Sequence, residues 1–226
     1  MIIAMKTLTV ARISSLPDKA ALVPVVLDEL NVSFVSVDTV NWRDDYPYCP
    51  EVAFRMAWCP EGIVLHYRVS EQSVRAKYVN DGEKVWTDSC VECFIRNEEN
   101  NVYYNIECNC IGTLLVGLGD GRHQRRSVPL DALESVLRWA SLGNEPFEER
   151  IGNTMWEVAL VIPRTVFATH PLRLMPDASL RANFYKCGDE LKVPHFATWN
   201  AIDTPSPDYH RPECFGVLRL ADSFTG

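Results

Sequence analysis

Carboxylates, amides and aromatic rings gather on two strand-like stretches near the middle of the chain, residues 90–95 and 102–110. The segment between them, at residues 97–101, reads Asn-Glu-Glu-Asn-Asn and is rich in turn-forming residues. The region is therefore expected to form a β-hairpin. Strand side chains point alternately to the two faces of a sheet, so the hairpin should have two chemically different faces.

One face of this predicted hairpin is wholly apolar and the other mixes polar groups with rings. The apolar face would carry Val91, Cys93, Ile95, Val102, Tyr104 and Ile106. The mixed face would carry Cys90, Glu92, Phe94, Tyr103, Asn105 and Glu107. A face that combines carboxylates, amides and rings is typical neither of core nor of an ordinary solvated sheet, and we interpret it as a recognition surface. Trp86 lies six residues before Glu92 and can supply an apolar platform at its edge.

Two carboxylates on the mixed face have a spacing that could support chemistry. Pairing Ile95 with Val102 places Glu92 opposite Asn105. Glu92 and Glu107 are then diagonal neighbours, roughly 7–8 Å apart at Cα. Paired carboxylates cut glycosidic bonds, but carboxylates also bind sugar hydroxyls without any catalysis. The two residues leave both possibilities open.

Three further side chains have a structural and a functional interpretation. Trp199 precedes a proline-rich loop at residues 204–212, and it could pack under that loop or stack on a ligand ring opposite Trp86. Asn183 lies on an alternating strand, where its amide could bond to backbone or contact the same ligand. His210 could act as a general base, but we expect it to close a loop. No catalytic residue is therefore assigned.

Composition limits the classes of partner. The net charge is −8, which argues against a nucleic-acid partner. The one basic cluster, at residues 122–126, is expected to be a solvated loop. No apolar run approaches the ~18 residues of a membrane span, and the start of the sequence has no basic segment before its short apolar patch. We therefore expect an unexported, cytoplasmic protein with no membrane partner.

The eight cysteines are expected to be reduced thiols packed in the core. Cys90 and Cys93 would point to opposite faces of a strand, while Cys108 and Cys110 would share the apolar face. Neither spacing makes the turn that a zinc knuckle requires. We therefore predict no metal site and no cofactor.

Strand signals recur from about residue 32 to the end of the sequence, and only residues 129–137 make a credible helix. The main strands are expected at residues 32–37, 52–58, 63–69, 90–95, 102–110, 154–162, 181–187 and 214–220. This pattern predicts an all-β fold, an antiparallel β-sandwich of immunoglobulin-like or jelly-roll type with one short helix. Residues 1–226 should form a single domain, with an N-terminal arm at 1–30 and the sandwich at 31–220.

An ordered set of short motifs carries a family resemblance. The set comprises Trp-Thr-Asp-Ser-Cys-Val-Glu-Cys-Phe at 86–94, Tyr-Tyr-Asn-Ile-Glu at 103–107, Trp-Glu-Val-Ala-Leu-Val-Ile-Pro at 156–163, Arg-Ala-Asn-Phe at 181–184 and His-Arg-Pro-Glu-Cys-Phe-Gly at 210–216. In these motifs the sequence resembles the family 9 carbohydrate-binding modules, part of a wider group of sugar- or haem-binding β-sandwich (DOMON-like) domains.

The resemblance implies a sugar site in which two Trp rings clamp a pyranose. Trp86 and Trp199 match those positions best, and Glu92 matches the carboxylate that accepts from sugar hydroxyls. Asn183 matches a polar contact, with Asn105 and Glu107 standing nearby. Family modules usually also carry a basic residue at the sugar, for which the sequence offers no clear counterpart.

The leading hypothesis is thus a non-catalytic protein that binds a mono- or oligosaccharide. One alternative is a glycoside-processing or sugar-modifying enzyme that uses Glu92 and Glu107. A second alternative is a haem-binding relative, although no Met/His pair on one strand face supports it.

Overall fold

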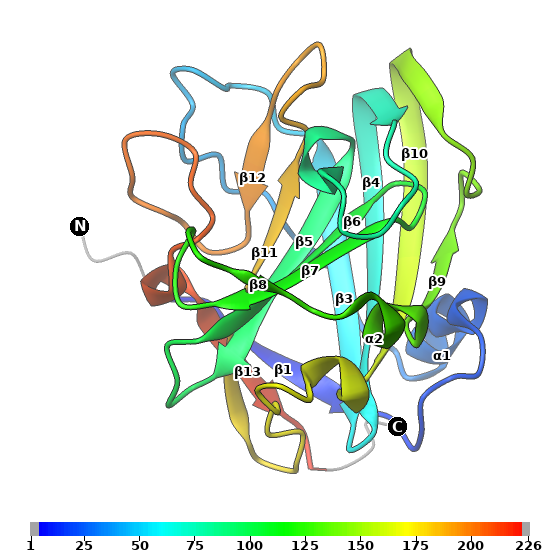
Figure 1. The fold of residues 1–226 in the computed structure, drawn as a ribbon, viewed down its shortest axis with the longest axis vertical. Helices are drawn as coiled ribbons and strands as arrows, with labels where there is room; N and C mark the ends of the chain where they lie inside the picture. Colours follow the sequence, from blue (N-terminus) through cyan, green and yellow to red (C-terminus); the bar gives the residue numbers. More distant parts are fainter. Residues whose placement is uncertain (1–4, 223–226) are drawn as a thin grey trace.

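The computed structural model describes residues 5–222, which are mostly β-strand (Figure 1). The strands of this part of the chain are β1 (Thr7–Arg12), β2 (Val35–Ser36), β3 (Glu51–Cys59), β4 (Gly62–Ala76), β5 (Cys90–Asn97), β6 (Tyr103–Asn109), β7 (Leu114–Gly119), β8 (Arg126–Ser127), β9 (Leu137–Ala140), β10 (Phe147–Pro163), β11 (Ser179–Cys187), β12 (Phe196–Thr198) and β13 (Gly216–Leu220). They form one 13-stranded sheet, which is curled.

Helical structure is short. The α-helices of the described residues are α1 (Val23–Glu29) and α2 (Leu130–Glu134), and the 3₁₀ turns are η1 (Ala20–Leu22), η2 (Val85–Thr87), η3 (Arg164–Phe167) and η4 (Pro212–Cys214). The helix expected at 129–137 is thus shorter than predicted, since β9 already begins at Leu137, and α1 was not expected as a helix. Within the described part of the chain, no helix has the length and apolar character that a membrane crossing requires.

Strand β1 joins the two halves of the sheet. The strand order is β8-β7-β6-β5-β11-β13-β1-β3-β4-β10-β9, with β12 added to β11 and β2 to β3. The first residues of β1 pair with β13 and its last two pair with β3, in both cases in parallel. The expectation of a wholly antiparallel sheet is wrong at this strand. The N-terminal arm expected at residues 1–30 is also corrected, because residues 7–12 lie inside the sheet.

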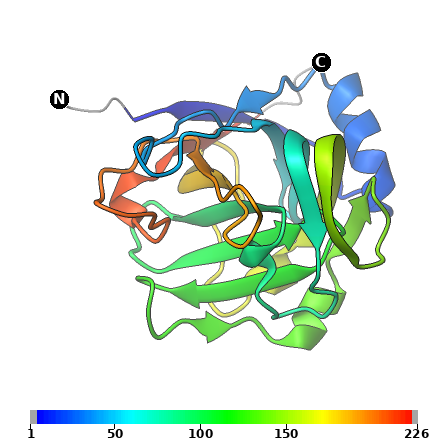
Figure 2. The same ribbon diagram turned by 90° about the horizontal axis from the view of Figure 1, so that it is seen from above.

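The two halves of the curled sheet pack against each other around the main core. In Figure 1 the strands β5–β7 cross in front of β3, β4 and β10, and Figure 2 shows the same two groups from above. Phe54 of β3 stacks on Phe184 of β11 with ring centroids 3.6 Å apart. The Tyr67 hydroxyl of β4 donates to the Glu92 carbonyl of β5 at 2.7 Å. The strands expected at 52–58 and 63–69 lie within β3 and β4, and the apolar side chains at their alternate positions are buried in this core.

A buried ion pair also joins the two halves. Lys186 of β11 lies 2.9 Å from Glu71 of β4, and both side chains are fully buried. The Trp156 indole donates to the other Glu71 oxygen at 2.6 Å, and the His195 ring lies 2.7 Å from the lysine nitrogen. Each member has polar partners, which is the condition for tolerating charge inside a core. Lys186 directly precedes Cys187, so this cluster anchors the end of β11 where the polar face of the hairpin lies.

The cysteines lead to a direct test of the fold. All eight are free in the structure; Cys49 and Cys214 are half-buried, and the other six are buried. We expect at most two thiols of the native protein to react quickly with a thiol reagent, because burial disfavours the reactive thiolate. Reaction in denaturant with a chelator but no reductant should give nearly eight. A denatured count of six would show a disulfide and contradict this prediction.

Candidate functional site

The hairpin of β5 and β6 forms as predicted, but its register differs by two residues. Glu92 lies directly opposite Glu107, and Phe94 lies opposite Asn105. The strand β5 runs on to Asn97 because it pairs there with Leu180 of β11, and the Arg96 guanidinium donates to loop carbonyls, including that of Glu98 at 2.9 Å. A shift of two residues keeps every side chain on its predicted face. The two carboxylates are therefore direct neighbours rather than diagonal ones.

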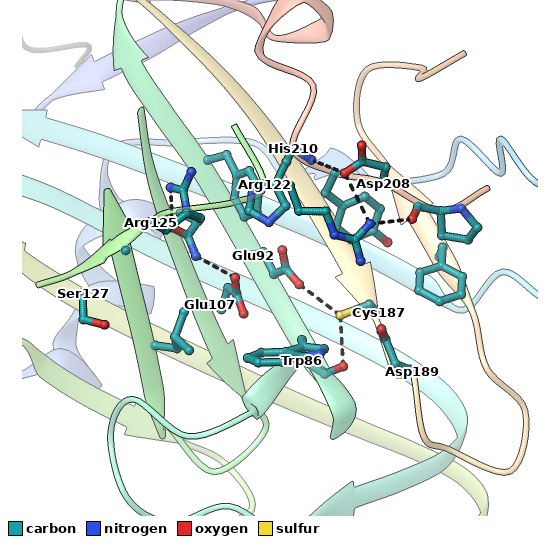
Figure 3. Close-up of a pocket in the computed structure, with 17 residues that line it drawn as sticks. Trp86, Glu92, Glu107, Arg122, Arg125, Ser127, Cys187, Asp189, Asp208 and His210 are labelled. Carbon is teal, nitrogen blue, oxygen red and sulfur yellow. Dashed lines mark hydrogen bonds and ion pairs between the residues drawn. The ribbon is translucent and has the colours of Figure 1, made fainter. Parts of the chain in front are cut away.

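The two faces of the hairpin have the predicted environments. The apolar face lies in the main core, with Val91, Cys93, Ile95, Tyr104 and Ile106 all buried there. The mixed face lines a cavity of about 360 Å³ (Figure 3). Pockets of this size commonly accept small ligands. Four of the six predicted site residues line it, namely Trp86, Glu92, Asn105 and Glu107.

Trp199 and Asn183 require correction, because neither lines the cavity. Trp199 is 2% exposed and packs in the main core, with its ring centroid 6.0 Å from Phe54 and 5.6 Å from Phe184. Asn183 is fully buried and its amide group bonds to the backbone of Asn200, accepting at 2.8 Å and donating at 3.1 Å. The structural interpretation of both residues therefore holds, and no clamp of Trp86 against Trp199 forms across this cavity.

Glu92 and Glu107 dominate the floor of the cavity. Glu107 Oε1 accepts from the Asn105 amide at 2.7 Å, and Glu92 Oε1 accepts from the Cys187 thiol at 3.1 Å. Within residues 5–222, Glu107 Oε2 is buried with no hydrogen-bond partner. Burial raises the pKa of Glu107 to about 7. Burial, and then the charge of Glu107, raises the pKa of Glu92 well above its usual range. The pair therefore retains protons near neutral pH and has an oxygen available for a donor.

Two arginines from the loop before β8 reach the cavity. Arg125 donates to Asn105 Oδ1 at 2.9 Å and to the Tyr103 carbonyl at 3.1 Å. Its guanidinium carbon lies 4.3 Å from the centroid of the Tyr103 ring. These bonds turn the Asn105 amide nitrogen toward Glu107. Arg122 lies 3.7 Å from Asp208 in the loop that follows β12. The basic cluster at 122–126 is thus not simply a solvated loop, and it supplies the basic groups that sequence analysis missed.

The glycines of β7 are the sequence signal for Arg125. A Cβ atom at Gly117 would lie 2.6 Å from Asn105 Oδ1, and one at Gly119 would lie 3.2 Å from the Arg125 guanidinium. Alternate positions of a strand point to one face, so the Gly-x-Gly spacing leaves a groove there. The two glycines thus make room for the Asn105 and Arg125 side chains.

His210 closes one wall of the cavity. Its Nδ1 atom lies 2.7 Å from the Tyr103 hydroxyl, and its ring packs on Phe94 with centroids 4.9 Å apart. Burial lowers the pKa of His210 to about 3, helped by the charge of Arg125. The Tyr103 hydroxyl donates a hydrogen bond to the neutral ring, and this contact fixes the loop to the sheet, in line with the predicted loop-closing role.

The remaining walls combine rings with acids. Trp86 of η2 is half-buried, and Phe94, Phe196 and Tyr209 also line the cavity. Asp189 stands near Cys187, and burial raises its pKa to about 6. Aromatic faces accept apolar C–H patches, while carboxyl, amide and guanidinium groups make directional hydrogen bonds. The arrangement suits a small polyhydroxylated ligand.

Comparison with known proteins agrees with this chemistry. A model of carbohydrate-binding family 9 matches residues 21–220. A crystal structure from Bacteroides uniformis, of a protein named provisionally as carbohydrate-binding, is 42% identical and superposes with a TM-score of 0.91, covering 96% of this chain and 100% of its own. A search of curated proteins finds no match.

Two more distant structures share the fold. Both are family 9 carbohydrate-binding modules from Caldicellulosiruptor kristjanssonii, 11% identical to this chain and covering 96% of it. The complex with glucose has a TM-score of 0.62 and is itself covered over 97% of its length. The complex with cellotriose has a TM-score of 0.59 and is covered over 95%.

The carboxyl pair predicts a specific pH dependence of stability. Between pH 4.5 and about 7 the folded chain binds a proton at Glu107 that the unfolded chain has released. The free energy of unfolding should therefore fall as pH rises through this window. Glu107→Gln removes this contribution, so urea denaturation across the window should show a shallower fall than in the unaltered protein. Glu148→Gln, at an exposed carboxylate, is the matched control. Equal slopes in the two variants would refute the buried-pair assignment.

Proposed function

Because the chain belongs to carbohydrate-binding family 9, we propose that the cavity on the β5–β6 hairpin binds a mono- or oligosaccharide without catalysis. The observation that carries the proposal is the buried pair of Glu92 and Glu107, with one oxygen that has no partner in the described protein. A sugar hydroxyl is a donor of the required kind, and a buried acceptor without a donor is costly. The two Caldicellulosiruptor kristjanssonii structures of family 9 modules, in complex with glucose and with cellotriose, support a saccharide as the ligand.

The residues of the cavity have distinct roles in this proposal. Trp86 offers its ring to one face of the pyranose, replacing the two-ring clamp with a single platform. Glu92 and Glu107 accept from hydroxyls, and Arg125 acts through Asn105, whose amide it orients. The cavity of about 360 Å³ limits the enclosed part of the ligand to one or two sugar rings.

The proposal extends to the fold class, which we infer to be a β-sandwich of immunoglobulin-like or jelly-roll type. Its support is the contact between the two halves of the curled sheet, where Phe54 stacks on Phe184. A rigid platform of this kind suits a binding site, because the polar side chains are held in place before the ligand arrives.

A second candidate function is glycoside processing. It is favoured by the direct pairing of Glu92 with Glu107, since opposite residues of neighbouring strands lie about 5 Å apart at Cβ. Retaining glycosidases place their two carboxyl groups about 5–5.5 Å apart. The raised pKa of Glu92 is also a property of a general acid.

Trp86→Ala tests the binding proposal. Loss of a stacking ring should weaken the affinity for the preferred sugar by about 1–3 kcal/mol. Calorimetric titration with a panel of mono- and oligosaccharides would measure the change. Trp139→Ala is the matched control, because Trp139 is half-buried against a different cluster on the far side of β10. Equal affinities for every sugar in the unaltered protein and in Trp86→Ala would reject the ring platform.

Glu92→Gln separates binding from catalysis. In a binding protein the substitution should weaken sugar affinity, because the carboxyl group can place its proton on either oxygen and accept at the other, whereas the Gln amide has one fixed acceptor. The same sugar panel, assayed for products, should show no turnover by the unaltered protein. The contrary result is turnover that Glu92→Gln abolishes while substrate affinity stays intact, which is the pattern of a catalytic acid.

A further inference from the structure

Two cysteines far apart in the sequence meet at the floor of the cavity. Cys90 of β5 pairs directly with Cys187 of β11 across neighbouring strands, so both thiols lie on the cavity face of the sheet. Both are buried and free. The Cys187 sulfur also donates to Glu92 Oε1 at 3.1 Å, as Figure 3 shows. The structure thus gathers two thiols and one carboxyl group from two strands.

The spacing of these three groups matches a tetrahedral metal site. The two sulfur atoms and one Glu92 oxygen all lie within 4.8 Å of one another. Zinc binds thiolate sulfur at about 2.3 Å and carboxylate oxygen at about 2.0–2.2 Å, so tetrahedral ligand atoms stand about 3.5–3.8 Å apart. The observed separations, at most 4.8 Å, exceed these distances by no more than about 1.3 Å.

We propose that Cys90, Cys187 and Glu92 bind one zinc ion at the floor of the cavity. Three protein ligands with a fourth position facing a cavity is the pattern of zinc sites that take a ligand or water. Cys187 and Glu92 line the cavity, so an ion can reach them from outside. Thiolates favour thiophilic metals such as zinc over magnesium or calcium.

A second observation on the same floor supports the proposal. Glu107 lies directly opposite Glu92, and its Oε2 atom is buried without a hydrogen-bond partner in the described protein. That oxygen can accept from a water molecule or hydroxyl group bound at the fourth position of the metal. Second-shell carboxylates of this kind orient metal ligands. In this arrangement Glu92 binds the metal ion directly, and Glu107 accepts a hydrogen bond from the group at the fourth position.

Binding requires the loss of protons and no redox step. Each thiol releases its proton to solvent as its sulfur binds, and a protonated Glu92 does the same, so up to three protons leave for each zinc ion that enters. Zinc affinity should therefore rise with pH.

The cysteines that lie near one another in the sequence predict no metal site, because neither spacing makes the turn that a zinc knuckle requires. As expected, Cys90 and Cys93 lie in different clusters, while Cys108 and Cys110 share the main core. The partner of Cys90 is Cys187, which only the pairing of β5 with β11 brings to it.

Metal titration of the reduced, purified chain tests the proposal. Zinc should bind with a stoichiometry of about one and release protons in calorimetry. Cobalt(II) in the same site should give a thiolate-to-metal charge-transfer absorption band, which reports sulfur ligands directly. Cys90→Ser and Cys187→Ser should each abolish the band and weaken zinc binding at least tenfold, because the loss of even an outer-shell partner of a metal ligand costs about 10–100-fold.

Cys49→Ser and Cys214→Ser are matched controls at the half-buried cysteines, and both should keep the band. Circular dichroism should show that every variant is folded. No zinc binding at micromolar metal, or a band that survives in the Cys90→Ser, Cys187→Ser double variant, would overturn the proposal. A Cys90–Cys187 disulfide in the protein as isolated, with no metal bound after reduction, would overturn it as well.

Discussion

Two acids placed side by side in a buried part of a sheet are the constraint on which the rest of the site depends. Glu92 and Glu107 face each other across β5 and β6, and no arginine or lysine forms an ion pair with either of them within residues 5–222. Like charges so close and so far from water are costly, which is why protons stay on the pair. A protein keeps such a pair where a ligand can use it, and functional sites are where shifted pKa values gather.

The neighbouring residues hold these acids in position without neutralising them. The Arg125 guanidinium donates to Asn105 and to backbone carbonyls rather than to either acid, and the Asn105 amide donates to Glu107. Cys187 donates to Glu92 from the other side. The Lys186–Glu71 ion pair lies behind the sheet and ties β11 to β4. The acids therefore stand on a stiff platform, and the loops at 120–125 and 204–210 supply the walls.

The alternation of side chains along β5 and β6 made the two faces of the hairpin predictable from the sequence. The period of two in β5 and β6 assigned each hairpin side chain to the correct face, and it did so in spite of the wrong register, because the error was two residues. Four of the predicted site residues line the cavity for this reason. Beyond Ile95 the strand β5 pairs with β11, and no rule of spacing within the hairpin expresses that long-range contact.

Contacts between distant segments could not be predicted in the same way. Trp199 has a ring that could stack on a sugar, and it precedes a loop that could line a binding site. Its backbone N–H, however, donates to the Phe184 carbonyl, and its side chain packs in the main core. Arg125 looked like part of a solvated basic loop, and only the missing side chains of Gly117 and Gly119 hint at its inward path. In each case the deciding partner is remote in sequence.

The central claim is that the cavity beside Glu92 and Glu107 is where this chain holds a sugar. A crystal structure of the protein soaked with the tightest-binding sugar of a calorimetric panel tests it most directly. The account predicts a pyranose against the Trp86 ring with a hydroxyl within hydrogen-bond distance of Glu107 Oε2. A sugar bound elsewhere on the protein, with Glu107 Oε2 still unpartnered, would contradict it.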